Sequence, residues 1–245
     1  MLYRKPKSAY LQKVEKAYLT VRTKEGRVYT DDQVLQLPNI SKSHHQYKEW
    51  LIRKDSLYKI LTVLNKQPQV KRILDLGCGN GWMCNALNKN GFEVVGMDIN
   101  QLELEQAARL FPQCTFYERD ILEDNSDLNP FDAIIISAAF QYFKEPQQLI
   151  EKLKNNLLNK DGFILIADTK FYTSMEFEAA QLRTEHYYHQ MEVSEMIEHY
   201  YHHNVNILTK INARIVRNSS IFGTIFNRIT GIKNPFNLYK ISQDF

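Results

Sequence analysis

The sequence lacks the features that mark several specialised classes of protein. No apolar stretch approaches the roughly 18 residues that a membrane span requires, and the N-terminus has no apolar core of a secretory signal. Its three cysteines are odd in number and show no metal-type pairing. The net charge of +3 is too small to indicate a partner. We therefore expect a cytoplasmic protein with reduced thiols, no transmembrane segment and no bound metal.

What is present is an ordinary globular composition, with 245 residues of which 44% are hydrophobic and 24% are charged. This is enough for one α/β domain with a substantial core. Strands are predicted at residues 72–76, 92–97, 114–117, 131–136 and 163–167, with weaker ones at 213–216 and 237–241. Helices are predicted at 41–66, 82–89 and 102–111, from Pro146 onward, and near 194–203. Because strands separated by helical patterns form right-handed crossovers, this alternation predicts a parallel sheet.

The first predicted strand of this alternation ends in a loop at Gly77–Gly81 with the sequence Gly-Cys-Gly-Asn-Gly. A dinucleotide site requires G-x-G-x-x-G, but here the third glycine comes one residue early and Trp82 occupies the small position. The carboxylate of Asp75 would also repel a pyrophosphate, and the Gly-Lys-Ser/Thr of a P-loop is missing. The loop therefore suits a ligand that carries positive charge and no phosphate.

Carboxylates lie at the ends of three successive predicted strands. Asp75 can hold an ammonium group through a charge-assisted contact. Asp98 lies 21 residues after Gly77, close to the spacing at which a carboxylate accepts from ribose hydroxyls. Asp120 can accept from an adenine amino group, while the backbone N–H of Ile121 donates to a ring nitrogen. S-adenosylmethionine fits this set, because it has an ammonium, a sulfonium and a neutral adenosine.

With these motifs, the chain resembles the class I S-adenosylmethionine-dependent methyltransferases over about Lys71–Asp168. The resemblance implies S-adenosylmethionine as cofactor and an α/β fold with a doubly wound, mostly parallel, seven-stranded Rossmann-like sheet. It also implies the strand order 3-2-1-4-5-7-6 with an antiparallel seventh strand. The chain then divides into an N-terminal helical extension or cap at 1–70 and a methyltransferase domain at 71–245. Within this domain, a core at 71–168 precedes a substrate-covering region with the last strands at 169–245. The implied cofactor-binding residues are Asp75, Gly77, Cys78, Gly79, Asp98, Ile99, Asp120, Ile121 and Ser137.

The acceptor is harder to predict. Members of this family that methylate base amines carry Asn/Asp-Pro-Pro-Tyr/Phe after the fourth strand, whereas this chain has Ser-Ala-Ala-Phe at 137–140. We therefore favour O- or N-methylation of a small-molecule acceptor and regard a nucleic-acid acceptor as less favoured. Gln141 stands where small-molecule members often have a His. The candidate catalytic residues are Tyr142, His186 and Tyr187, because Tyr and His at the mouth of a cleft can orient an acceptor or take its proton.

Other interpretations stay open at this point. Basic residues near both ends of the sequence suit a nucleic-acid or protein methyltransferase, and a non-catalytic protein that binds S-adenosylmethionine is a third possibility. Glu195 and His199 have the spacing of two metal ligands on a helix, and Ile221–Ile232 could form a membrane-surface helix. We favour plain packing or solvation for both segments. The sequence gives no oligomeric state.

Overall fold

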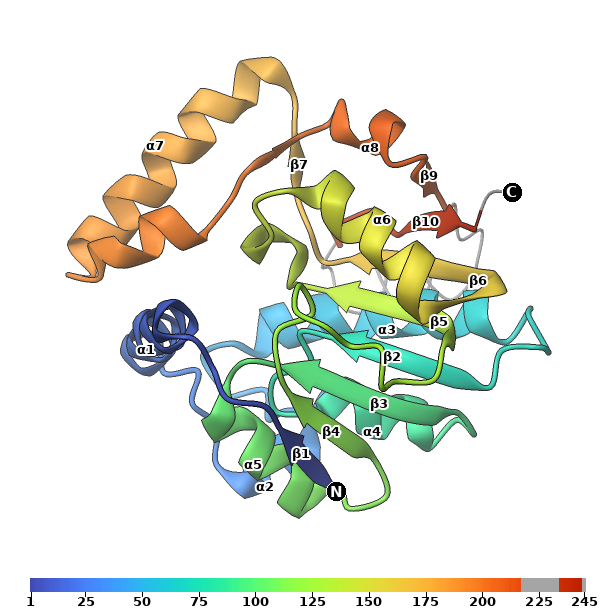
Figure 1. Cartoon of the computed structure of the whole chain (residues 1–245). Coiled ribbons are helices and arrows are strands. Elements are labelled where there is room, and N and C mark those ends of the chain that lie inside the picture. Colours follow the sequence, from blue (N-terminus) through green and yellow to red (C-terminus); the bar gives the residue numbers. More distant parts are fainter. Residues whose placement is uncertain (217–233, 244–245) are drawn as a thin grey trace.

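Eight strands of the described chain form one central sheet with helices on both faces (Figure 1). The computed structural model describes residues 1–216 and 234–243. The strands of this sheet are β1 (Leu2–Arg4), β2 (Arg72–Leu76), β3 (Glu93–Asp98), β4 (Thr115–Glu118), β5 (Phe131–Ser137), β6 (Leu158–Ala167), β9 (Arg214–Ile215) and β10 (Tyr239–Ser242). Their order is β1-β4-β3-β2-β5-β6-β10-β9, and β10 is antiparallel to both of its neighbours.

The predicted count of seven strands is wrong by one. From β4 to β9 the order is the expected 3-2-1-4-5-7-6, but β1 adds an eighth strand parallel to the edge strand β4. Its register pairs Leu2 with Phe116, and the ring of Tyr3 stacks on that of Tyr117 with centroids 5.0 Å apart. A three-residue strand has no periodicity to detect, and the unpaired backbone of an edge strand determines its position.

The central strands are buried on both faces because helices cover each side. The α-helices of the described residues are α1 (Ala9–Lys24), α2 (Asp31–Gln36), α3 (Tyr47–Leu64), α4 (Trp82–Asn88), α5 (Gln101–Leu110), α6 (Pro146–Leu157), α7 (Ser174–Gln190) and α8 (Ile207–Lys210), of which α3, α4 and α5 pack on one face and α6 on the other. Alternate residues of each strand point to opposite faces. Ile73 and Ile135 pack in the cluster of α3, α4 and α5, whereas Leu74 and Ile134 pack in the cluster of α6. This explains why the strands read as continuous apolar runs.

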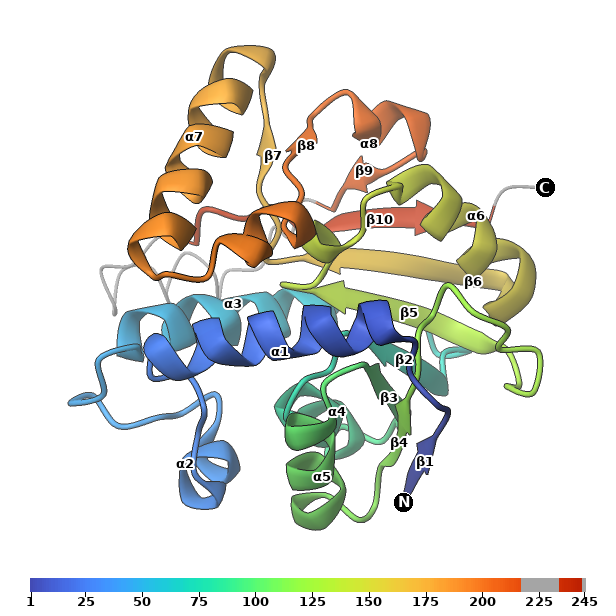
Figure 2. The same ribbon diagram turned by 60° about the vertical axis from the view of Figure 1, so that its left-hand side comes forward.

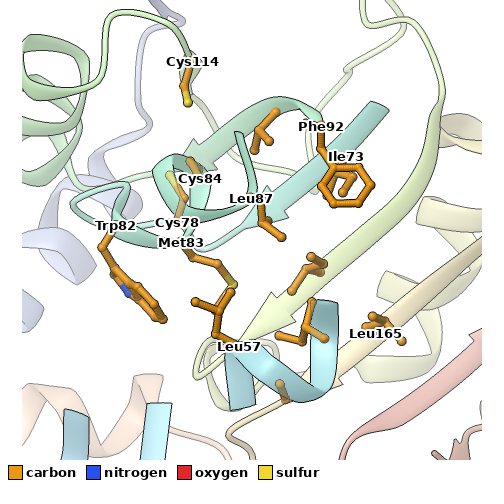
Figure 3. Packing of buried hydrophobic residues seen from close by; sticks show 14 of the residues in the cluster. Leu57, Ile73, Cys78, Trp82, Met83, Cys84, Leu87, Phe92, Cys114 and Leu165 are labelled. Atoms are coloured by element: carbon orange, nitrogen blue, oxygen red, sulfur yellow. The ribbon is translucent and has the colours of Figure 1, made fainter. Parts of the chain in front are cut away.

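Figure 3 shows part of the first cluster from close by. Leu57 of α3 and Met83 and Leu87 of α4 lie over the sheet beside Ile73 of β2. Ile73 and Leu87 are fully buried, and burying such a side chain contributes about 1.5–3 kcal/mol. This packing fixes α4 against β2 and so determines the position of the loop between them.

Two helices that the sequence did not predict lie beyond the carboxyl ends of the strands. The arrowheads of β2, β3 and β5 point toward α1 and α7 (Figure 1), and α1 runs across this edge of the sheet (Figure 2). Ser8 caps α1 by accepting from the N–H of Leu11 at 3.2 Å, and Thr173 opens α7 with a capping box. Together these helices cover the edge at which doubly wound sheets bind ligands.

The helix predicted near 194–203 is wrong over its last four residues, and the rest is a 3-10 helix. A short 3-10 helix, η2, spans Ser194–His199, and the chain then becomes extended to form β8 (His203–Asn204). β8 pairs in parallel with β7 (Phe171–Tyr172), a contact between distant segments that local periodicity cannot reveal. The segment Ile221–Ile232, for which a membrane-surface helix was the less favoured alternative, lies outside the described residues. Within the described ranges, no helix combines the length and the apolar character needed to cross a membrane.

Candidate active site

A cavity of about 930 Å³ lies at the carboxyl edge of the sheet. The strand ends and the glycine loop form one side of it, and α1, α3 and α7 contribute to the other. All nine residues predicted to bind the cofactor line this cavity: Asp75, Gly77, Cys78, Gly79, Asp98, Ile99, Asp120, Ile121 and Ser137. The fold therefore brings together residues that are up to 62 positions apart in the sequence.

The loop after β2 presents bare backbone to the cavity. Gly77 has a φ of +77°, and a Cβ added there would lie 2.3 Å from the Cβ of Ala139. Its N–H donates to the carbonyl of Met97 at 2.8 Å, which anchors the loop to the end of β3. Gly79 also has a positive φ, of +51°. Both positions are in the left-handed region that glycine adopts without steric cost.

Asp98 organises the loop from the end of β3. Its Oδ2 accepts from the N–H of Gly79 at 2.8 Å, and its Oδ1 accepts from the N–H groups of Ile99 at 2.7 Å and Asn100 at 2.9 Å. Burial raises the pKa of Asp98, while these three backbone donors act in the opposite direction. The carboxylate thus has free lone pairs beside the cavity in a position held by the backbone.

Asp75 lies deeper, inside β2, and is only 2% exposed. Its Oδ2 accepts from the thiol of Cys84 at 3.2 Å, and burial raises the pKa of Asp75 to about 7. Asp120 lies after β4, where its Oδ1 accepts from the N–H of Leu122 at 2.8 Å. The three acids therefore differ in environment, with Asp75 the most strongly desolvated.

Ser137 has a partner that the sequence reasoning did not assign. Its hydroxyl donates to Oδ2 of Asp168 at 2.9 Å, and Ser56 of α3 donates to Oδ1 at 2.5 Å. Asp168 follows β6, lines the cavity, and has a φ of +51°. Burial raises the pKa of its carboxyl group. The sequence could have indicated this residue, because Asp168 directly follows the fifth predicted strand. The other acids of the site were identified by the same position at the end of a strand.

The three candidate catalytic residues have different locations. Tyr142 and Tyr187 line the cavity, but His186 does not. His186 is exposed on α7, where its ring nitrogen lies 2.8 Å from the amide of Gln190. Burial raises the pKa of Tyr142, and burial together with a hydrogen bond to Glu25 raises the pKa of Tyr187 to about 12. Both tyrosines are therefore hydrogen-bonding groups at neutral pH, not bases.

The residues with metal-ligand spacing are not aligned in the fold. Glu195 and His199 lie in η2, whose tighter winding does not place residues four apart on one face. Nδ1 of His199 instead lies 3.3 Å from the hydroxyl of Tyr10. Within residues 1–216 and 234–243, no group of three His, Cys, Asp or Glu side chains could hold a metal ion.

The strand order and a cavity at the carboxyl edge define a Rossmann-like, ligand-binding α/β protein. A family model described as a methyltransferase domain matches residues 69–228, more than half of the chain. With this match, the chain belongs to the class I S-adenosylmethionine-dependent methyltransferases, and S-adenosylmethionine is its cofactor.

Curated relatives agree over shorter spans. The putative methyltransferase YqeM of Bacillus subtilis is 32% identical over 104 residues, which are 40% of this chain and 42% of that protein. A malonyl-[acyl-carrier protein] O-methyltransferase of Halalkalibacterium halodurans is 23% identical over 175 residues, 63% of this chain and 64% of that protein. The chain thus matches about two fifths to two thirds of the length of these relatives.

Solved structures share the fold along nearly the whole chain. The plantazolicin methyltransferase BpumL in complex with SAH has a TM-score of 0.57 at 15% identity, covering 96% of this chain and 98% of that one. Magnesium protoporphyrin IX methyltransferase from Synechocystis PCC 6803 with bound SAH has a TM-score of 0.58 at 14% identity, covering 94% and 100%. At this identity, the likeness shows the fold.

Proposed function

We propose that the protein transfers the methyl group of S-adenosylmethionine to an oxygen or nitrogen of a small-molecule acceptor. The observation that carries this proposal is the set of three carboxylates, Asp75, Asp98 and Asp120, around a glycine backbone that admits no side chain at Gly77. A cationic nucleoside fits such a site, and a pyrophosphate does not.

The residues of the site suit separate parts of the cofactor. Asp98, which accepts from three backbone N–H groups, would accept from the ribose hydroxyls. Asp120 and Ile121 would hold the adenine edge, and Asp75 would favour the positive charge of the methionine end. Ser137, fixed by Asp168, would line the methyl-bearing centre. In this proposal, Cys78, Gly79 and Ile99 contact the cofactor along the loop.

The size and cover of the cavity support a small acceptor. A volume of about 930 Å³ lies near the top of the ~300–1,000 Å³ range of ligand sites, which leaves room for two molecules. α1 and α7 lie beyond the carboxyl edge of the sheet (Figure 1), and residues of both helices line the cavity. We propose that residues 1–70 and the described part of 169–245 serve as this cover over the core at 71–168.

S-adenosylmethionine supplies a methyl group that its sulfonium already activates. The residues of this chain then need to align the acceptor, exclude water and keep the two ligands in contact, which can contribute several kcal/mol to the rate. We propose that Ser137, whose hydroxyl donates to Asp168 at 2.9 Å, lies beside the methyl position. The predicted cytoplasmic location stays a prediction.

Calorimetry and turnover test the proposed function. The purified protein should bind both S-adenosylmethionine and its demethylated product, because the acids and the loop contact groups common to both. Turnover, measured as release of the demethylated product, should then occur when a mixture of phenols, carboxylic acids and amines is added. Added RNA or protein should not support it. Binding without turnover on any pool would favour the non-catalytic alternative, and absence of binding to either nucleoside would end the proposal.

Asp98→Ala should weaken binding of the demethylated product by about 1.5–3 kcal/mol, because charge-assisted hydrogen bonds to the ribose are lost. The backbone N–H groups of Gly79, Ile99 and Asn100 also lose their acceptor. Asp124→Ala is the matched control, since Asp124 is an exposed acid that accepts from the N–H of Ser126 at 2.9 Å outside the cavity. Wild-type affinity in the Asp98 variant would remove this residue from the cofactor site.

A further inference from the structure

Four tyrosines from different elements form a continuous aromatic wall in the cavity. The wall consists of Tyr18 of α1, Tyr142 of η1 (Phe140–Tyr142), Tyr200 after η2 and Tyr188 of α7, all of which line the cavity. Neighbouring rings meet edge to face, with centroid distances of 5.7, 5.9 and 6.1 Å along this series. Such rings pack well against a planar aromatic ligand and keep their hydroxyls for polar contacts.

Positive charge gathers on the elements that cover the cavity. Arg22 of α1, Lys144 after η1 and Arg183 of α7 all line it. Arg183 and Lys144 form no ion pair with the residues that the structure describes. The carboxylates of the proposed cofactor site lie at the strand ends, while the covering elements also bring Glu15, Glu25 and Glu49 to the cavity.

Acidic residues on the covering side are already neutralised. Glu15 of α1 forms an ion pair with Lys7. Glu25, at the end of α1, lies 3.1 Å from Nε of Arg27 and also accepts from the hydroxyl of Tyr187. Glu25 therefore has a closer cationic partner in Arg27 than in Arg22, which lies 4.0 Å from it.

Arg22 is the least exposed of these three cations. Its shortest approach to Glu25 is 4.0 Å, and its buried Nε has no hydrogen-bond acceptor within residues 1–216 and 234–243. Glu103 also faces Arg22, but its Oε2 accepts from Asn100 at 2.9 Å and burial raises the pKa of Glu103 to about 7. A guanidinium whose side chain is only 19% exposed favours an anionic partner that satisfies its unused donor.

Building on the methyl transfer proposed above, we propose that the acceptor is a small aromatic carboxylate. Its ring packs on the wall formed by Tyr18, Tyr142, Tyr188 and Tyr200, and its carboxylate binds Arg22. Arg22 lies over the ring of Tyr18, 5.4 Å from the centroid, so the cation and the wall form one site. The methionine part of the cofactor also has a carboxylate that could bind Arg22. The experiment must therefore distinguish the carboxylate of the acceptor from that of the cofactor.

Calorimetry on the full-length protein saturated with the demethylated product separates them. Naphthoate, the neutral naphthylmethanol and the cationic naphthylmethylamine serve as probes with one shared ring system. Naphthoate should bind at least about tenfold tighter than the other two. Arg22→Gln should lower naphthoate affinity by about tenfold or more, whereas Arg22→Lys should restore part of it. Lys16→Gln makes the same charge change at an exposed position of α1 outside the cavity and should leave naphthoate affinity unchanged.

Each variant is also titrated with the demethylated product alone. An Arg22→Gln variant that loses affinity for this product while keeping naphthoate affinity would assign Arg22 to the methionine end and overturn the proposal. Preference for the amine, or no binding of any naphthalene probe to a protein that still binds the demethylated product, would overturn it as well. Failure to bind the demethylated product in the wild type would instead contradict the proposed function, so the two failures are distinguishable.

Discussion

Gly77→Ala should nearly abolish binding of S-adenosylmethionine while the protein still folds. The new Cβ would lie 2.3 Å from the Cβ of Ala139, and the residue would keep a φ of +77° that side chains rarely adopt. Holding a non-glycine residue in this region costs about 1–3 kcal/mol, and the contact with Ala139 forces the loop to move as well. Because the loop carries the backbone that meets the cofactor, we expect an affinity loss of about 100-fold or more.

Gly91→Ala is the control for this prediction. Gly91 has a φ of +91°, but a Cβ there would meet nothing within 4 Å, and the residue lies outside the cavity. The strained backbone should lower the free energy of unfolding of this variant, measured in urea. Its affinity for the cofactor, measured by calorimetry, should not change. If Gly77→Ala binds the demethylated product as the wild type does, the loop after β2 does not contact the cofactor.

Asp75→Asn should stabilise the fold above neutral pH and weaken the cofactor site at the same time. Burial raises the pKa of Asp75 from 3.8 to about 7, so the folded protein holds a proton that the unfolded chain releases at lower pH. The free energy of unfolding of the wild type therefore falls between about pH 4 and pH 7. Asparagine has no charge to desolvate and can still accept from the thiol of Cys84. Since each pKa unit corresponds to about 1.4 kcal/mol, the variant should be a few kcal/mol more stable at pH 8.

Urea unfolding at pH 5 and pH 8 measures this effect, and the advantage of the variant should shrink at the lower pH. Asp132→Asn is a control of opposite sign, because burial raises the pKa of Asp132 but is outweighed by the N–H groups of Arg72 and Lys71, both at 2.8 Å, together with Asn159 and the charge of Arg72, so that its pKa is lowered. That variant should be less stable than the wild type at neutral pH, and the difference should vanish as Asp132 becomes protonated in acid. Loss of affinity for S-adenosylmethionine in Asp75→Asn at pH 8 would show that its charge serves binding. An Asp75 variant no more stable than the wild type at pH 8 would mean that this carboxylate carries no desolvation cost.

The outcomes for particular elements show where sequence reasoning succeeded. β2, β5 and residues 163–167 of β6 were predicted because each is a mainly apolar run, and their burial on both faces explains that pattern. Asp75, Asp98 and Asp120 were placed at one edge by topology alone, since parallel strands bring their carboxyl ends together. The structure places all three at the cavity.

The predictions that failed concern elements whose position depends on distant segments or whose periodicity is weak. β1 pairs with a strand more than 100 residues away, and β8 pairs with β7 across 30 residues. α1 and α7 bury few apolar side chains, so their sequences show only weak amphipathic periodicity. The prediction of His186 followed residue type, and the face of α7 on which it lies could not be seen from the sequence.

The sequence by itself determined the parallel sheet, the bare loop at Gly77 and the acids that meet at the strand ends. These features depend on local periodicity and on the order of strands and helices, both of which can be recognised from neighbouring residues in the sequence. Only the tertiary structure decided that Asp168 joins Ser137 to Ser56, that Arg22 enters the cavity and that His186 stays outside it. Contacts of this kind form between segments far apart in the chain, where packing and charge, not local pattern, determine which side chains meet.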